Sequence, residues 1–322
     1  MIINLLLSLI PICISTVLAI ITNGGDIYGL LDYISFIGVL LIFSVAIFIS
    51  GYGKTFCRIF STKKKFQSFD FQELQKTEQA LDFGSKILFY AVMLIPILVL
   101  IYTLTNYHDT PDTLMHLGPN CAILLLSILY LSLFEMIIIT LRAKIRKSQI
   151  SYMADETQDM NKEIISSKSS FNKMILGLIL LLTVCNIYGW FSGVFSWGEQ
   201  SLFTSVFDIP FILIMILYVL PLVAVSENIN SLFESIRIIL TGKKVTVTKK
   251  NLYLNAVKTT MHLNWYAAFS GAVCGWIGML YNLENVSALL KNFAETLIPF
   301  LYATCLNLFL LLAEIRITKA AE

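Results

Sequence analysis

The chain has 322 residues, of which 57% are hydrophobic and only 14% are charged. Soluble domains carry about 25% charged residues, so this composition excludes an ordinary soluble protein and indicates an integral membrane protein. The formal net charge of +2 at pH 7 gives no reason to expect a nucleic-acid partner.

Eight apolar segments, each near the length that crosses a bilayer, follow one another along the chain. Because backbone groups in lipid must bond to one another, we expect each segment to be a helix and the fold class to be all-α. The first segment has no basic residues before it and no small-residue cleavage site after it, so we expect a retained helix and not a secretory signal. The segments are Ile2–Ile21, Tyr33–Ile49, Ile87–Leu104, Pro119–Leu141, Met174–Phe191, Ile209–Val225, Trp265–Leu283 and Leu297–Ala313.

The second segment is followed by Gly53-Lys54-Thr55, which is similar to the end of a phosphate-binding loop. Such a loop needs a glycine five positions before Gly53, and that position is Phe48. We therefore expect a helix that leaves the membrane at Ser50 and no nucleotide site.

The lysines and arginines indicate the orientation of the chain, because positively charged loops resist translocation. If the loops after the second, fourth, sixth and eighth segments share one side, that side holds 22 of the 23 basic residues and leaves Lys291 opposite. This bias predicts that both termini are cytoplasmic.

The chain also repeats itself. Leu30–Ser50 and Val206–Ser226 each carry an aspartate, Asp32 or Asp208, eighteen positions before their final serine. Three further pairs keep nearly the same offset, namely Tyr102 with Tyr281, Pro119 with Pro299, and Glu135 with Glu314. We therefore predict two parallel four-helix repeats, residues 1–150 and 173–322, joined by a cytoplasmic linker at 151–172.

The first copy carries Asp32 with Ser35, Leu117–Tyr130 and Thr140–Ile145; the second carries Asp208-Ile209-Pro210, Gly271–Asn285, and Pro299 with Ala303-Thr304. In these residues each repeat resembles the MotA/TolQ/ExbB family of ion-driven channels, with MotA closest because its unit has four helices. The resemblance implies a location in a bacterial inner membrane and a ring of subunits, such as five chains with one copy inside, around a single-span MotB/TolR/ExbD-like partner. An aspartate of that partner would carry a proton or sodium ion. None of the eight segments holds a central charged residue, which agrees with a carrier on another chain.

The resemblance also implies roles for individual residues. The outer helix starts are Asp32, Asp208 and Pro210, the inner-mouth acids are Glu135 and Glu314, and the pore- or partner-facing residues are Gly271, Ala272, Gly275, Gly278, Thr304 and Ser127. The small residues of the second copy favour that copy as the inner one.

Each of these roles has a structural alternative. The glycines could serve close helix packing, and the hydroxyls could bond the carbonyl four residues back. Glu135 and Glu314 could pair with Arg142 and Arg316 near the interface.

No catalytic or metal pattern occurs in the sequence. The six cysteines lack a metal-binding spacing, and His108, His116 and His262 are expected at the surface or the interface. We therefore expect no enzyme, no cofactor and no metal site. A non-conducting structural subunit is the alternative function, while a transporter is disfavoured because Pro96 and Pro221 do not occupy matching places.

Overall fold

The computed structural model describes residues 2–22, 32–59, 69–105, 111–157, 209–241, 247–281, 293 and 296–319. The described residues form helices and no strand. The all-α class is therefore confirmed for this part of the chain. The predicted segment Met174–Phe191 lies outside the described residues.

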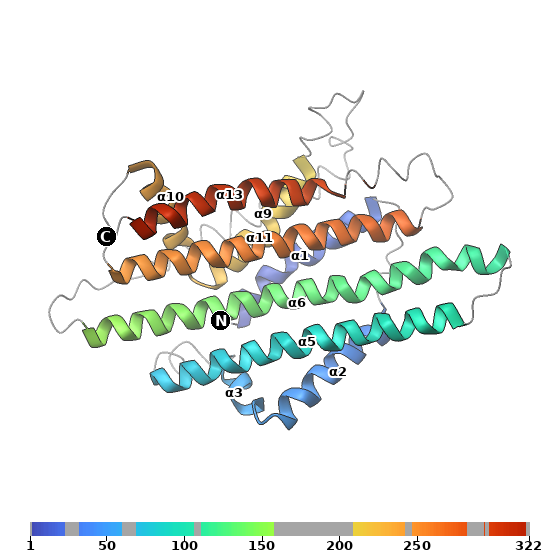
Figure 1. Cartoon of the computed structure of the whole chain (residues 1–322), viewed down its shortest axis with the longest axis horizontal. Helices are drawn as coiled ribbons and strands as arrows, with labels where there is room; N and C mark the ends of the chain where they lie inside the picture. Colours follow the sequence, from blue (N-terminus) through green and yellow to red (C-terminus); the bar gives the residue numbers. More distant parts are fainter. Residues whose placement is uncertain are drawn as a thin grey trace.

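Four long helices lie side by side and form one layer (Figure 1). Their order across the layer is α5 (Phe71–Thr105), α6 (Pro111–Thr157), α11 (Val247–Tyr281) and α13 (Ile298–Lys319). Successive helices of the layer run in opposite directions, as the colours along the chain show (Figure 1). The α6–α11 contact joins the predicted first copy to the second.

The helices of this layer are longer than the apolar segments that predicted them. At about 1.5 Å per residue, the 35 residues of α5 and α11 extend about 52 Å and the 47 residues of α6 about 70 Å. The hydrocarbon core of a bilayer is about 30 Å thick, so each helix has a long polar end. The last turns of α6 cross the boundary predicted at residue 150 and enter the predicted linker.

Two described helices are long and apolar enough to cross a membrane, through Leu124–Met153 of α6 and Ile298–Ile315 of α13. A third candidate combines Ile212–Val225 with Ile229–Ile238, which meet at 109°. The arrangement of eight spans stays a prediction.

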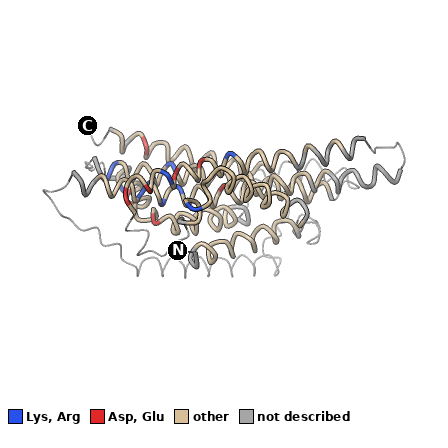
Figure 2. Tube along the Cα trace, turned by 90° about the horizontal axis from the view of Figure 1, so that it is seen from below, with Lys and Arg blue, Asp and Glu red and all other residues tan. Residues whose placement is uncertain are grey.

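Three shorter helices lie on one side of the layer (Figures 1 and 2). They are α1 (Ile2–Thr22), α2 (Tyr33–Ile49) and α9 (Ile209–Val225), and the bounds of α2 and α9 are those predicted. Helix α2 packs on α5, whereas α1 packs on α9 and α11 of the predicted second copy.

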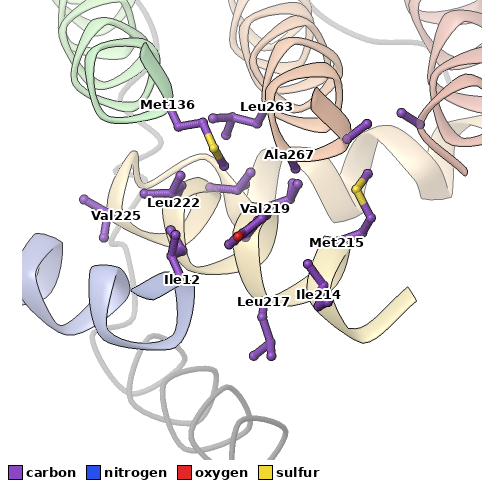
Figure 3. Packing of buried hydrophobic residues seen from close by; sticks show 14 of the residues in the cluster. Ile12, Met136, Ile214, Met215, Leu217, Val219, Leu222, Val225, Leu263 and Ala267 are labelled. Atoms are coloured by element: carbon purple, nitrogen blue, oxygen red, sulfur yellow. The ribbon is translucent and has the colours of Figure 1, made fainter. Parts of the chain in front are cut away.

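The core between α1, α9 and the layer is built from large aliphatic side chains, including Ile12, Met136 and Leu222 (Figure 3). One polar contact lies within it. The hydroxyl groups of Thr16 on α1 and Tyr218 on α9 are 2.6 Å apart, and Tyr218 is fully buried. This bond satisfies a phenol that would otherwise lose its hydrogen bonds to water.

Helices α2 and α9 both end in the same type of turn. At the end of α2, the Ser50 amide donates to the Ala46 carbonyl and the Ser50 hydroxyl donates to the Ile47 carbonyl. At the end of α9, the Ser226 amide and hydroxyl bond the carbonyls of Leu222 and Val223 in the same way.

The next residue in each turn has a left-handed backbone, with φ of 77° at Gly51 and 60° at Glu227. Each turn leads into a further helix, α3 (Gly53–Arg58) or α10 (Ile229–Thr241). We call these turns the first and second elbow.

Candidate functional site

The described charged residues gather toward one end of the long helices, and few lie among the described residues toward the other end (Figure 2). Ion pairs cross between helices at the charged end. Arg142 of α6 binds Asp82 of α5 at 2.6 Å, Arg146 binds Glu78 at 2.6 Å, and Lys144 binds Glu227 at 2.9 Å. This segregation is the one that the basic residues predicted from the sequence.

A cleft of about 610 Å³ opens between α5, α6 and α11 at the charged end. Lys144 and Lys147 bind the second elbow from one side of α6, through the carboxylate and the carbonyl of Glu227. Residues two positions apart on a helix point in nearly opposite directions, so Arg142 and Arg146 line the cleft from the other side. The cleft therefore lies on the face of the layer away from the second elbow.

Glu135 is located at the apolar end of this cleft. Only 6% of its surface is exposed, and its carboxylate accepts a 2.6 Å hydrogen bond from Ser85 of α5. Tyr266 of α11 lines the cleft at the same end. The predicted inner-mouth position of Glu135 thus coincides with the place where a polar cavity meets the apolar part of the layer.

Glu314 occupies a different setting. Its carboxylate lies 3.3 Å from the Lys258 ammonium, and Lys258 in turn lines the cleft. The two acids predicted to match are therefore both near the cleft, but Glu135 borders it directly and Glu314 reaches it through Lys258.

The cleft has an aliphatic floor and amide groups along one wall. Ile139, Ile150 and Leu254 supply apolar surface. Asn255 of α11 lines the wall and donates to the Ala143 carbonyl of α6 at 3.0 Å, which ties the two helices together.

Deeper in the apolar part of the layer, Ser132 of α6 and Ser270 of α11 have their hydroxyl oxygens 2.7 Å apart. Both side chains are fully buried. This bond joins the predicted first copy to the second at a point where neither hydroxyl can reach water.

The glycines predicted to face a pore pack within the chain. A Cβ added at Gly271 would lie 3.3 Å from Pro299, and one added at Gly275 would overlap Thr296. Both neighbours belong to the start of α13 or the turn before it. Ala272 and Gly278 are buried as well. These contacts support the close-packing alternative and leave no room for a partner helix at Gly271 or Gly275.

The two hydroxyl side chains predicted to face a pore differ in exposure and in hydrogen bonding. Thr304 is exposed on α13 and donates to the Phe300 carbonyl at 2.7 Å, which is the alternative stated for it. Ser127 is 1% exposed, and its oxygen has no hydrogen-bond partner within the described part of the chain.

The predicted outer helix starts are described only in part. Asp32 directly precedes α2, and its carbonyl accepts the Phe36 amide. Asp208 and the side chain of Pro210 lie outside the described residues.

The sequence did not predict that residues of α6 and α11 line one cleft. Lys258 and His262 are four residues apart on α11, as Arg142 and Arg146 are on α6, so each pair shares a helix face. This spacing was visible in the sequence. That the two faces meet depends on the packing of α6 against α11, which the repeat did not predict.

Comparison of the chain with known protein families, curated proteins and solved structures finds no match.

Proposed function

We propose that this chain is the multi-helix subunit of an ion-coupled membrane complex, as its resemblance to the MotA/TolQ/ExbB family implies. In this proposal the chain surrounds a single-span partner helix, and an aspartate of that partner carries a proton or sodium ion. The flow of the ion drives movement of the complex.

The observation that carries the proposal is the position of Glu135. A buried carboxylate within the apolar part of a membrane protein is costly to keep. Here it lies where the apolar part of the layer meets the polar cleft. An ion that leaves the apolar part would therefore encounter Glu135 first and then pass through the cleft. We propose the cleft as the inner mouth of the ion path.

In this proposal the partner helix contacts a different surface of the chain from the one that the sequence suggested. Helices α1, α2 and α9 lie on one side of the layer, and the cleft opens on the other. Along the apolar half of the layer, the edge helices expose large side chains, including Leu94 and Ile97 of α5 and Leu301 of α13. We propose that the partner lies against the side on which the cleft opens, in place of the glycines of α11.

A second function, that of a non-conducting structural subunit, is favoured by the ion pairs around the cleft. Arg142, Arg146 and Lys258 each bind a carboxylate of another helix. Such pairs fix how the polar ends of the helices pack, and they need no ion flow.

Ion flux measured with and without the partner separates these functions. The chain is reconstituted in liposomes together with a single-span membrane protein encoded beside it, and internal pH and sodium are followed with fluorescent indicators. We expect flux when both proteins are present. Glu135→Gln should reduce it at least tenfold at an unchanged protein level, whereas the matched control Glu234→Gln, on the exposed side of α10, should not.

Absence of flux with both proteins present would favour the structural function. Flux that does not depend on the partner would contradict an ion carrier on the partner, and flux that Glu135→Gln leaves unchanged would contradict the role of Glu135 at the inner mouth.

A further inference from the structure

The cleft has a positive electrostatic environment around His262. Burial lowers the pKa of this imidazole, and Arg142, Arg146 and Lys258 lower it further. All three cations line the same cleft as His262. Cations from two helices therefore disfavour a positive charge at His262, and an anion beside this imidazole would be attracted by each of them.

The carboxylates of the cleft are already engaged. Glu78 accepts hydrogen bonds from Arg146 at 2.6 Å and from Gln149 at 3.0 Å. Glu135 is buried and accepts the Ser85 hydroxyl. Glu78 is the ion-pair partner of Arg146 and Glu135 is held by Ser85, so the contacts of these two carboxylates are to α5 and α6 and not to Lys258 or His262 of α11.

Two of the cations have donors that their ion pairs do not engage. The Nε atom of Arg142 is buried and has no hydrogen-bond partner in the described residues, although its NH2 group binds Asp82. Lys258 has a side chain that is 58% exposed, and its contact with Glu314 at 3.3 Å engages one of three ammonium protons. The wall of the cleft therefore has more donors than acceptors to satisfy them.

We propose that this cleft binds a phosphate group between Arg142 of α6 and Lys258 and His262 of α11. A phosphate accepts several hydrogen bonds at once from guanidinium and ammonium groups. Both a phospholipid headgroup and free phosphate have this chemistry. The cleft begins where the apolar part of the layer ends, and its floor is aliphatic, which suits the headgroup of an anionic lipid at the inner surface of a membrane.

This inference does not depend on ion conduction, and its test contains no flux measurement. The full chain is purified in detergent, stripped of lipid and given two probes separately. One is inorganic phosphate, followed by titration calorimetry. The other is a nanodisc of phosphatidylcholine with or without phosphatidylglycerol, followed by native mass spectrometry of the lipids that stay bound.

We expect saturable binding of at least one probe, with affinity that rises as pH falls and His262 gains its proton. Lys258→Gln should weaken binding roughly tenfold, because it removes a charge-assisted hydrogen bond, and His262→Gln should do so at the acidic end of the pH range, where the imidazole is charged. Lys258→Arg should keep it. The control is Lys249→Gln, which removes the same charge from an exposed position of α11 outside the cleft.

The result identifies the source of the phosphate. Phosphatidylglycerol binding alone assigns a lipid headgroup, and inorganic phosphate binding alone assigns a soluble phosphate. Binding of neither probe overturns the proposal, as does binding that the Lys258 and His262 variants leave unchanged. Thermal unfolding of each variant shows that a loss of binding is not a loss of the fold.

Discussion

Gly51 and Glu227 have the same left-handed backbone conformation at the same kind of turn, although 176 residues separate them in sequence. In both turns a serine immediately before them bonds back to the carbonyl three residues earlier. A left-handed residue is favourable for glycine and costs other residues about 1–2 kcal/mol. That the second turn keeps this conformation with a glutamate supports the predicted repeat at this point of the chain.

The first elbow tests the cost of the backbone alone. Nothing lies within 4 Å of a Cβ added at Gly51, so Gly51→Ala should lower the free energy of unfolding by about 1 kcal/mol through its positive φ alone. The measurement is thermal unfolding of the detergent-purified chain. An unchanged stability would mean that the turn relaxes to another conformation at no cost.

In the second elbow, the free-energy cost of the left-handed backbone occurs together with an ion pair. The Glu227 carboxylate binds Lys144, whose side chain is only 12% exposed. Glu227→Asn keeps a residue that tolerates a left-handed backbone but shortens the side chain, and it should destabilise the chain by about 1 kcal/mol. Lys144→Met should cost a similar amount. Because both changes remove one interaction, the double variant should be no worse than the single ones, and simple additivity would contradict the pairing.

The α11–α13 contact gives a prediction about steric fit. A Cβ at Gly275 would overlap Cγ2 of Thr296, whereas one at Gly271 would meet Pro299 at 3.3 Å. Gly275→Ala should therefore destabilise the chain by about 1–3 kcal/mol, and Gly271→Ala by less. Thr296→Ser removes the overlapping methyl and keeps the hydroxyl that accepts the Trp276 indole N–H. It should restore the stability of Gly275→Ala, and failure to do so would place the strain elsewhere.

The stability of the chain should depend on pH through His262. Its pKa is lowered in the folded chain, while an unfolded histidine has a pKa of about 6.5. The unfolded chain therefore binds the proton more tightly. The free energy of unfolding should be constant well above pH 6.5, fall as pH drops through 6.5 toward the lower folded pKa, and level off below it. His262→Gln should remove this component from unfolding curves recorded between pH 5 and 8, and an identical pH profile in both proteins would contradict it.

The orientation predicted from the basic residues can be tested in intact cells. Cysteines introduced at Lys63, Lys243 and Lys319, in a chain whose six native cysteines are replaced by serine, should resist a membrane-impermeant thiol reagent. They should react once the cells are permeabilised. Labelling of any of them from outside would overturn the predicted topology.

The sequence predicted some helices closely because their apolar character ends at a clear signal. The bounds of α2 and α9 were as expected, since each apolar run stops at a serine turn. The long helices were underestimated for the opposite reason. Hydropathy marks the part of a helix that suits lipid, and α5, α6 and α11 continue beyond it as polar helical ends that carry ion pairs.

The sequence pointed to a residue of the candidate cleft only where the residue type is unusual for its position. Glu135 was visible as a charged residue near the inner end of an apolar segment, and the structure places it at a cavity. The small residues of α11 were ambiguous, because a glycine permits close approach whether the neighbour is a partner or the chain itself. His262 was expected at a surface, and its contribution to the cleft depends on cations from another helix.

The contact of α1 with α9 and α11 has a consequence for how the protein is made. The bond between Thr16 and Tyr218 joins residues 202 positions apart, so the first helix is synthesised long before the surface that it packs on. Contacts this distant in sequence slow folding. The native packing of α1 therefore has to wait until α9 and α11 have been synthesised.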